Sequence, residues 1–341
     1  MRAIIPLAGK GTRLRPHTLT IPKPLIRIGG RPVMSYILDD LKELGIEEVV
    51  FVVGYLREEV EAYISREYPG FTSHYVVQEV QDGTAGAVAL AEPWADEDLL
   101  ILFVDTLFEA DLSLIRTLPT GWSGIIWAKE VEDYQRFGVI VTDQDGAMTR
   151  IVEKPTEPVS KLANIGLYYI RDSALLFQGI RHVLSVPPGP SGEFFLTDAF
   201  QYMVDRGAKI RTAPVGGWYD CGKVETLLET NHHLLLTTRG GIDPGATLER
   251  CEIVGPVRVE AGARLVNVAL GPNVTVERGV HIRDSAIRDS IVGQGSVVRG
   301  CHLHDSIVGK ESRLDGVTGR VNLGAFSELQ GDHGTTPNLE S

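Results

Sequence analysis

A glycine-rich, basic loop near the start of the chain is the first place where residue types and spacing suggest chemistry. The loop follows a short apolar run and reads Leu7-Ala8-Gly9-Lys10-Gly11-Thr12-Arg13-Leu14-Arg15-Pro16. Its two glycines allow the backbone to approach an anion and to turn N–H groups toward phosphate oxygens. Lysine and arginine add positive charge, and arginine can contact a phosphate through two N–H groups. The loop is therefore a candidate anion cradle, while a simple tight turn is the alternative.

Two common phosphate-binding motifs are excluded for this loop. A Walker A motif requires Gly-Lys-Ser or Gly-Lys-Thr at a fixed distance after its first glycine, and neither follows here. A Rossmann dinucleotide motif requires a third glycine, where this chain has Arg-Leu-Arg-Pro. Further along, Lys23 lies between Pro22 and Pro24, which stiffen the backbone around it. This frame favours a functional role for Lys23 over that of a solvated surface lysine.

The elements that must position these residues alternate between apolar runs and helical patterns up to about residue 236. Val49–Val53 and Leu99–Val104 are continuous apolar runs of strand length. Between the first strand and Val49–Val53, the segment Pro32–Leu44 carries an apolar stripe at helical spacing and is followed by Gly45. This order predicts an α/β domain over residues 1–236 with ligands at the carboxyl ends of its strands.

The pattern changes from about Gly240, where helical periodicity stops. Aliphatic residues recur there at a spacing of six, in the sets Leu270, Val276, Ile282 and Ile291, Val297, Leu303. The sequence Asp-Ser-Ile-Val-Gly also occurs twice, at 289–293 and 305–309. Short repeats of this kind predict a parallel β-helix over residues 237–330 in which the aliphatic side chains point inward. An antiparallel sandwich is the alternative, and residues 331–341 are expected to form a flexible tail.

Composition limits the partners and the location of the protein. The net charge of −12 argues against nucleic acid, whose binding requires a basic face. The apolar runs are too short to span a membrane, and no leader sequence precedes the first strand, so we expect a cytoplasmic protein. Cys221, Cys251 and Cys301 are widely spaced and are expected to be reduced thiols. Cys301 and the adjacent His302 lack the further ligands that a metal site needs.

The loop and the Pro-Lys-Pro-Leu segment after it resemble those of the sugar-1-phosphate nucleotidylyltransferases. The resemblance continues in order through the motifs Gln78 with Gly83-Thr84-Ala85, Asp105, Phe137-Gly138-Val139, Glu153-Lys154-Pro155, Asn164–Tyr168, Glu193 to Asp198, and Trp218–Gly222. It implies a Rossmann-like α/β nucleotidyltransferase domain with a mixed, mostly parallel sheet. The tail resembles the left-handed parallel β-helix of the long, glucose-1-phosphate thymidylyltransferase-like members.

The resemblance also implies which residues bind the nucleotide. They are Leu7, Ala8, Gly9, Gly11, Thr12, Arg13, Gln78, Gly83 and Thr84. The Gln78 carboxamide could pair with the Watson–Crick edge of thymine or uracil, and Gly83 would let a base lie against the backbone. Arg13 and Lys23 would stabilise the charge on the transferred phosphoryl group.

For the sugar 1-phosphate and the metal, the resemblance implies a second group of residues. The residues expected to bind the sugar phosphate are Gly138, Glu153, Lys154, Asn164 and Trp218. Asp105 and Asp220 would hold Mg²⁺, which prefers carboxylate oxygens and often binds together with phosphates. The implied catalytic residues are Arg13, Lys23, Asp105 and Lys154. Val104 departs from the family pattern, in which a glycine usually precedes the metal-binding aspartate.

The expected reaction is in-line attack of the sugar phosphate on the α-phosphorus of a nucleoside triphosphate, with release of pyrophosphate. The attacking oxygen is already an anion, so neither a general base nor a covalent nucleophile is needed. We expect dTTP or UTP and glucose 1-phosphate as substrates. The Gly-Thr-Ala sequence and Asn164 lean instead toward N-acetylglucosamine-1-phosphate uridylyl transfer or mannose-1-phosphate guanylyl transfer.

Two other classes of function are weighed against this one. The β-helix could carry an acyltransferase site with His281, His302 or His304 as the base. The chain could also be a non-catalytic regulatory paralogue, although the retention of Arg13, Lys23, Asp105, Lys154 and Asp220 argues against this. We further expect a homo-oligomer that assembles through the β-helix.

Overall fold

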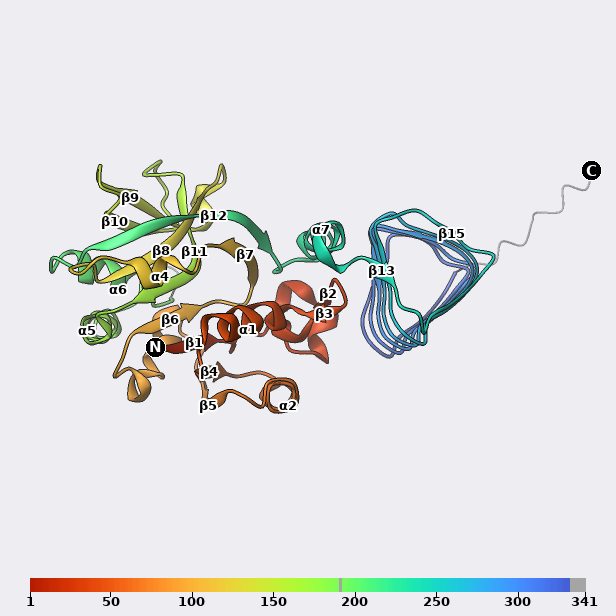
Figure 1. Ribbon diagram of the computed structural model, residues 1–341, viewed down its shortest axis with the longest axis horizontal. Helices are drawn as coiled ribbons and strands as arrows, with labels where there is room; N and C mark the ends of the chain where they lie inside the picture. The colour runs from red at the N-terminus through yellow and green to blue at the C-terminus, as the bar shows by residue number, and fades with distance from the viewer. Residues whose placement is uncertain (190–191, 332–341) are drawn as a thin grey trace, which may run out of the picture. The chain divides into compact units, whose positions relative to one another are not determined.

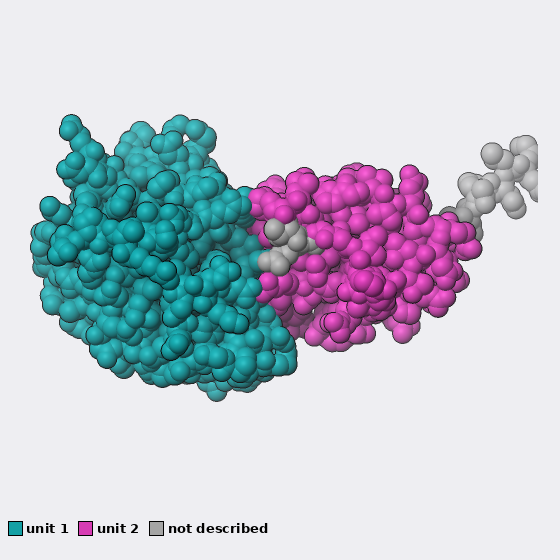
Figure 2. Space-filling model, in the orientation of Figure 1, with its two compact units in different colours: residues 1–10, 34–219 teal, residues 11–33, 220–341 magenta. Residues whose placement is uncertain are grey.

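Two compact units make up the chain in the computed structural model, which describes residues 1–189 and 192–331 (Figure 1). Unit 1 contains residues 1–10 and 34–219, and unit 2 contains residues 11–33 and 220–341 (Figure 2). The predicted boundary between a catalytic domain and a β-helix domain after residue 236 is a statement about the order of domains along the chain, and it stays a prediction. The tail expected at the carboxyl end lies outside the described residues from residue 332 onward.

Unit 1 is built on a mixed sheet with the strand order β5-β4-β1-β6-β11-β8-β12-β7. β1, β4, β5 and β6 pair in parallel, whereas β11 runs antiparallel to β6 and to β8. β9 pairs with β10 and with β11. The strand bounds are β1 Arg2–Pro6, β4 Glu48–Val53, β5 Thr72–Val77, β6 Leu99–Leu102, β7 Thr106–Ala110, β8 Gly124–Glu130, β9 Gly138–Thr142, β10 Met148–Glu153, β11 Leu162–Ile170 and β12 Ile210–Asp220. The predicted α/β fold with a mixed sheet is confirmed.

The strands and the first helix form close to where the apolar pattern predicts them, except that β6 ends at Leu102 and α1 begins at Val33, since Pro32 belongs to β3 (Arg31–Pro32). All side chains of β4 from Val49 to Val53 are at most 1% exposed, as expected for a strand between two parallel neighbours. α1 (Val33–Leu44) buries Val33, Ile37 and Leu41 on one face. The residue after its last turn is Gly45, whose φ of 78° lies in the left-handed region that favours glycine.

The helices of unit 1 enclose a core on the sheet. Side chains from α3, α5 and α6 share one buried cluster with side chains of β1, β4 and β6. The bounds of the helices are α2 Arg57–Glu67, α3 Thr84–Ala89, α4 Leu114–Thr117, α5 Ser173–Leu184 and α6 Leu196–Val204. Among the described residues, no helix combines the length and the apolar character that a membrane span requires.

Unit 2 contains the predicted parallel β-helix, whose coils outline a triangle in Figure 1. One face has the order β13-β16-β18-β20-β23-β26 and another has β14-β17-β19-β21-β24-β27, with β15, β22 and β25 off these paths. Strands in neighbouring coils pair in parallel, so the predicted β-helix is confirmed, while its left-handed sense stays a prediction. The longest strands are β17 Arg264–Leu270 and β19 His281–Arg288.

The other strands of the β-helix are two or three residues long. Their bounds are β13 Gly241–Ile242, β14 Thr247–Glu249, β15 Glu252–Ile253, β16 Val257–Val259, β18 Val274–Val276, β20 Ser290–Val292, β21 Val297–Arg299, β22 His302–His304, β23 Ile307–Val308, β24 Arg313–Asp315, β25 Thr318–Gly319, β26 Asn322–Leu323 and β27 Glu328–Gln330. Strands this short suit a coil that turns at each corner of the triangle.

The interior of the β-helix corrects two predicted positions. Leu270, Val276 and Ile282 are 1% exposed or less and lie in the core, as predicted. Ile291 and Val297, in contrast, are not members of that core cluster, although Ile291 is only 4% exposed, and their neighbours Val292 and Val298 take the interior positions. Side chains alternate between the two sides of a strand, so a one-residue error in register reverses the direction. The six-residue spacing alone does not fix that register.

Residues 11–33 also belong to unit 2. This segment contains three short 3₁₀ turns and a two-stranded hairpin, with the bounds Thr12–Leu14, His17–Leu19, Lys23–Leu25, β2 Arg27–Ile28 and β3 Arg31–Pro32. The helix α7 (Val224–Leu234) lies in the same unit and contacts β2. The second half of the glycine-rich loop therefore packs with the β-helix unit, which the sequence did not indicate.

Candidate active site

The first half of the glycine-rich loop continues β1 at the carboxyl end of the sheet. Leu7 and Ala8 are buried, and the Leu7 N–H donates to the carbonyl of Val52 at 2.7 Å. Gln81 Nε2 donates to the Ala8 carbonyl at 2.6 Å. A Cβ built at Gly9 would meet no atom within 4 Å, so the space beside this glycine is open. An open side next to backbone N–H groups suits a bound phosphate.

Gln78 and Gly83 lie just beyond β5, where the chain turns into α3. Gln78 is 8% exposed, and its Nε2 donates to Asp82 Oδ1 at 3.1 Å and to the Gly83 carbonyl at 3.4 Å. Gly83 has a φ of 121°, and a Cβ there would lie 2.3 Å from the carbonyl oxygen of Phe194. Residue 83 must therefore be glycine because a side chain there would clash with the backbone of residue 194. The sequence alone did not indicate this reason.

Thr84 supports the same turn. Its Oγ1 accepts a hydrogen bond from the Leu196 N–H at 2.9 Å, and the Ala85 N–H donates to the Phe194 carbonyl at 2.9 Å. These bonds tie the start of α3 to the start of α6. In the described structure the Thr84 side chain therefore holds the backbone at α6, and nucleotide contact by Thr84 stays a prediction.

A cluster of four polar side chains lies around Gly138, at the junction of β9, β10 and β11, and its members are Glu153, Asn164, Thr197 and Tyr168. Gly138 and Glu153 are partners in the β9–β10 register. A Cβ at Gly138 would lie 2.4 Å from Asn164 Nδ2, 2.7 Å from Glu153 Oε2 and 2.9 Å from Thr197 Cγ2. Asn164 Nδ2 donates to the Gly138 carbonyl at 2.8 Å, and Thr197 Oγ1 donates to Glu153 Oε2 at 3.1 Å. The structure thus brings together three of the residues predicted to bind the sugar phosphate.

Two residues of this cluster were missed as site residues from the sequence. Thr197 positions the Glu153 carboxylate, and the Tyr168 hydroxyl donates to Asn164 Oδ1. A signal for Tyr168 was present in its position four residues after Asn164 in the same strand, although the register with β8 shifts between the two residues and strict alternation does not hold there. No comparable local signal identified Thr197, which reaches Glu153 from α6.

The carboxyl groups of the cluster lie in surroundings that disfavour their charge. Burial raises the pKa of Glu153, and the hydrogen bond from Thr197 opposes that rise only in part. Burial also raises the pKa of Asp198. The pKa of Tyr168 is raised by burial and then by the charges of Glu153 and Asp105. Asp105 is therefore within electrostatic reach of the same cluster.

Lys154 and Trp218 complete the predicted sugar-phosphate group. Lys154 follows β10 with a φ of 43°, which is uncommon for a residue with a side chain. Its Nζ lies 3.6 Å from Glu193 Oε2 and 4.8 Å from the centre of the Phe195 ring. Trp218 packs edge-on against Phe137, with ring centres 4.9 Å apart. Its buried Nε1 has no hydrogen-bond partner among the described residues, which leaves a donor for a bound ligand.

The second half of the loop, in unit 2, places Lys23 beside Gly11. Gly11 has a φ of 60°, and a Cβ there would lie 2.9 Å from Thr18 Cγ2 and 3.0 Å from Lys23 Cβ. Thr18 Oγ1 donates to the Gly11 carbonyl at 2.8 Å. Glycine is required at residue 11 both by the left-handed backbone and by this contact. Thr12 begins the 3₁₀ turn that also contains Arg13.

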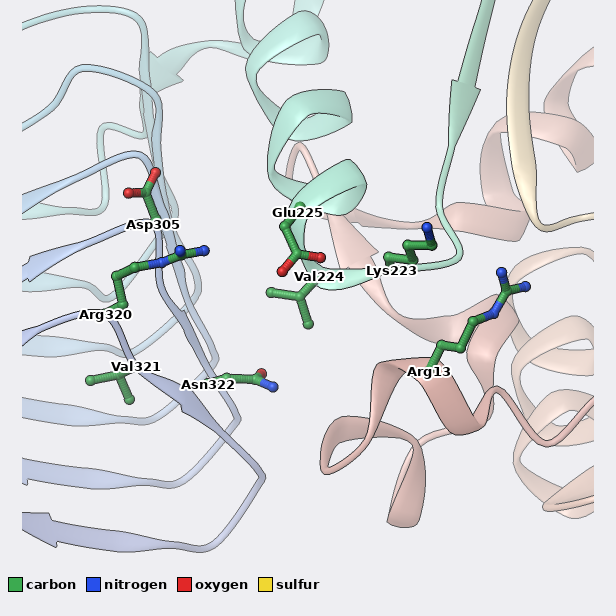
Figure 3. Close-up of a pocket in the computed structure, with 8 residues that line it drawn as sticks. All are labelled: Arg13, Lys223, Val224, Glu225, Asp305, Arg320, Val321 and Asn322. Carbon is green, nitrogen blue, oxygen red and sulfur yellow. The ribbon is translucent and has the colours of Figure 1, made fainter. Parts of the chain in front are cut away.

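Arg13 lies close to the predicted metal ligand Asp220. Its Nη2 would be 3.6 Å from a Cβ built at Gly222, whose N–H donates to Asp220 Oδ1 at 2.7 Å. Arg13 also lines a pocket of about 580 Å³, shown in Figure 3. The other residues that line it are Lys223, Val224, Glu225, Asp305, Arg320, Val321 and Asn322. The lining of this pocket carries three positive charges, on Arg13, Lys223 and Arg320, and two negative charges, on Glu225 and Asp305.

Asp105 and Asp220, the two predicted metal ligands, each carry a carboxylate of the kind that a divalent metal binds. Asp105 lies in the connection between β6 and β7 and Asp220 at the end of β12, and both are partly exposed. Carboxylate oxygens are the ligands that Mg²⁺ takes, together with waters and substrate phosphates. The described residues contain no cluster of three or more His, Cys, Asp or Glu side chains that could hold a metal without such partners. Asp105 belongs to unit 1 and Asp220 to unit 2.

Comparison with known proteins agrees with this arrangement. A family model described as nucleotidyl transferase matches residues 2–236. The chain is 32% identical to the low-salt glycan biosynthesis nucleotidyltransferase Agl11 of Haloferax volcanii, over 92% of this chain and 94% of that protein. It is 31% identical to a glucose-1-phosphate thymidylyltransferase of Streptomyces antibioticus, over 93% of this chain and 89% of that protein.

A solved structure extends the comparison to the fold. The structure of UDP-glucose pyrophosphorylase complexed with UDP-glucose is similar, with a TM-score of 0.61 and 25% identity over 68% of this chain and 97% of that one. The chain belongs to the nucleotidyl transferase family. Its resemblance to the sugar-1-phosphate nucleotidylyltransferases is confirmed, and the protein is an enzyme of that class.

Proposed function

We propose that this enzyme transfers a nucleoside monophosphate from dTTP or UTP to glucose 1-phosphate and releases pyrophosphate. The cluster around Gly138 is the observation that carries the proposal. Because residue 138 has no side chain, Asn164 Nδ2 and Glu153 Oε2 can lie close to the backbone of β9. A carboxylate and an amide so placed can receive and donate hydrogen bonds to sugar hydroxyls. Relatives named for glucose 1-phosphate support this choice of sugar.

The contacts of Asn164 bear on the alternative of an N-acetylated sugar. The argument for that alternative relied on a carboxamide with a donor and an acceptor available for an acetamido group. In the structure the Asn164 carboxamide donates to the Gly138 carbonyl and accepts from the Tyr168 hydroxyl. Each end of this side chain thus makes one bond inside the protein and keeps one further hydrogen-bonding position. The choice of a sugar without an N-acetyl group therefore rests on the relatives named for glucose 1-phosphate. Gln78 supports a pyrimidine through its Oε1, which can accept a hydrogen bond from N3–H, while its Nε2 already donates to Asp82 and to the Gly83 carbonyl.

The charged residues have separate proposed roles. Arg13 and Lys23 bind the triphosphate and stabilise the charge that develops on the α-phosphate. Lys154 binds the phosphate of the sugar 1-phosphate and orients its oxygen toward the α-phosphorus, so that the attack needs no general base. Leu7, Ala8, Gly9, Gly11 and Thr12 contribute backbone groups to the phosphate cradle. Trp218 Nε1 offers a further donor to the sugar-phosphate side.

A divalent metal completes the proposed site. The family generally depends on such a metal, and we propose Mg²⁺ held by Asp105 and Asp220. When bound, Mg²⁺ neutralises phosphate charge and thereby lowers the repulsion between the two substrates.

Cellular context and assembly are also part of the proposal. We propose a cytoplasmic homo-oligomer in which β-helices contact one another. Large apolar side chains on the described β-helix support such a contact, because Val254 and Phe326 are 50% and 64% exposed. Light scattering on the purified protein tests the assembly, and a monomer at micromolar concentration would contradict it.

A substrate matrix tests the proposed reaction. Pyrophosphate release is measured for dTTP, UTP, GTP, CTP and ATP against glucose, N-acetylglucosamine and mannose 1-phosphates, with and without Mg²⁺. We expect the highest kcat/KM for a pyrimidine triphosphate with glucose 1-phosphate, and no turnover without the metal. Asp105→Asn and Arg13→Ala should each reduce kcat by roughly a hundredfold or more. A preference for N-acetylglucosamine or mannose 1-phosphate would contradict the proposed sugar.

A further inference from the structure

Residues 11–33 carry two of the proposed catalytic cations, Arg13 and Lys23, yet they group with the β-helix and not with the sheet that carries the other half of the loop. Only chain connections at residues 10–11 and 33–34 join this segment covalently to unit 1. Within unit 2, the segment is fastened to the β-helix at both of its ends.

Arg27 makes the first attachment. Its Nε donates to Glu277 Oε1 at 2.8 Å, and its Nη2 donates to Glu260 Oε1 at 3.0 Å. Glu277 is 5% exposed, so its charge requires a partner, and burial raises its pKa in opposition to Arg27. Each glutamate also accepts a hydrogen bond from the β-helix backbone. The Gln294 N–H donates to Glu277, and the Arg278 N–H donates to Glu260. Arg27 therefore binds a pair of carboxylates that are already held in place.

A buried amide on α7 makes the second attachment. Asn231 is 0% exposed, and its Oδ1 accepts from the Gly29 N–H at 2.9 Å and from Thr275 Oγ1 at 2.7 Å. One oxygen thus connects the hairpin of the segment to strand β18 of the β-helix. At the other end of the segment, His17 Nε2 lies 2.6 Å from Asn322 Oδ1 in β26. Lys23 lies between these attachments, and Arg13 lies four residues before the His17 contact.

We propose that the β-helix is the scaffold that positions the phosphate-binding segment, with Arg27 as a positioning residue for Arg13 and Lys23. The inference rests on the proposed function, because it assumes that these two cations bind the triphosphate. It assigns the β-helix a part in catalysis that requires no second active site. Loss of the Arg27 attachment should then weaken triphosphate use and leave sugar-phosphate binding in unit 1 unchanged.

Kinetics of Arg27→Met test this separation. Because small displacements of a positioning group cost up to about a hundredfold in rate, we expect kcat/KM for the triphosphate to fall roughly tenfold or more. KM for the sugar 1-phosphate should stay within about twofold of wild type. A variant that was only less stable would lower kcat through loss of active protein and leave both KM values unchanged. Arg27→Lys should restore part of the loss, since it keeps the charge but lacks the paired donors.

Two further variants keep the test decisive. Thr275→Val removes the hydroxyl that donates to Asn231 and changes the side-chain volume little. It should raise the triphosphate KM as Arg27→Met does, and it replaces that variant in the test if Arg27→Met does not fold. Arg264→Met is the matched control, because Arg264 forms an exposed ion pair with Glu249 at 3.7 Å elsewhere on the β-helix. It should leave all kinetic constants unchanged.

Amide hydrogen exchange on the full chain provides a readout that does not depend on turnover. Residues 11–33 should exchange faster in Arg27→Met than in wild type, while β17 and β19 keep their protection. Unchanged exchange in residues 11–33, or faster exchange with unchanged triphosphate kinetics, would overturn the inference. If wild type transfers no nucleotide at all, the proposed function fails, and exchange still decides whether the β-helix holds the segment.

Discussion

The side-chain amide of Asn164 donates a 2.8 Å hydrogen bond to the backbone carbonyl of Gly138, and its nitrogen lies only 2.4 Å from the position that a Cβ on residue 138 would take. β9, β10 and β11 meet at this point, and each contributes one residue of the proposed sugar site. The close packing of Asn164 and Glu153 around residue 138 therefore depends on the absence of a Cβ. The first prediction concerns that absence.

Gly138→Ala should damage sugar binding more than stability. The new Cβ would lie 2.4 Å from Asn164 Nδ2 and 2.7 Å from Glu153 Oε2, so both side chains must move. We expect KM for glucose 1-phosphate to rise roughly tenfold and stability to fall by about 1–3 kcal/mol, as for other overpacked sites. Gly70→Ala is the control, because a Cβ at Gly70 meets no atom within 4 Å. An unchanged KM in Gly138→Ala would remove this cluster from the sugar site.

Lys154→Met should reduce use of the sugar phosphate. The methionine keeps an apolar stem next to Phe195 but removes the charge that lies 3.6 Å from Glu193. Loss of a charge-assisted phosphate contact costs about 1.5–3 kcal/mol, so kcat/KM for glucose 1-phosphate should fall by roughly 10- to 100-fold. Steady-state kinetics with varied sugar 1-phosphate measures the change. Lys161→Met, which breaks an exposed pair with Glu132, should behave as wild type, and equal effects in both variants would contradict the role of Lys154.

Asp40 on α1 should make stability depend on pH. Burial, together with the nearby charges of Glu43 and Asp39, raises the pKa of Asp40 from 3.8 to about 6 in the folded protein. The folded state then binds the proton more tightly than the unfolded state. The stabilising contribution is complete below pH 3.8 and is lost as the pH rises through about 6.

Asp40→Asn tests this dependence. The variant should gain about 1–2 kcal/mol over wild type at pH 8, a figure reduced for the partial exposure of the side chain, and almost nothing at pH 4. Urea unfolding at the two pH values measures the difference. A gain of the same size at pH 4 and pH 8 would show that the carboxyl group does not titrate between them.

Buried serines should stabilise the β-helix by joining successive coils. Ser306 is 0% exposed, and its Oγ donates to the His304 carbonyl at 2.7 Å and accepts from the Val321 N–H at 2.9 Å. Ser290 and Ser312 accept equivalent bonds from the next coil. Ser306→Ala leaves a buried N–H without this partner and should cost about 1–3 kcal/mol. Thermal unfolding compares it with the exposed control Thr318→Ala, and equal stability of the two variants would refute the role of the ladder.

The sequence predicted the elements whose pattern is local. The continuous apolar run Val49–Val53 predicted a strand that is buried on both sides, and the spacing of Val33, Ile37 and Leu41 predicted the buried face of α1. The β-helix was predictable because its repeats are copied along the chain. The inward direction of Val292 and Val298 was not, because a spacing of six is also compatible with a register one residue away.

The rest depends on contacts between residues far apart in the sequence. Thr197 meets Glu153 only after α6 packs beside β10, and Arg27 meets Glu277 across 250 residues of chain. Such partners leave no local pattern. The family resemblance identified Gly138, Glu153 and Asn164 as site residues. It gave no reason why residue 138 must be glycine, and the structure supplies one in the position of the Asn164 amide.

The fate of the α-phosphate tests the central claim most directly. The purified wild-type enzyme is incubated with Mg²⁺, glucose 1-phosphate and UTP or dTTP carrying one label in the α-phosphate and another in the γ-phosphate. The account predicts that the α-label appears in a nucleoside diphosphate sugar and the γ-label in pyrophosphate, in equal amounts. Release of the γ-label as orthophosphate, or retention of the α-label on the protein, would contradict a single in-line transfer to the sugar phosphate.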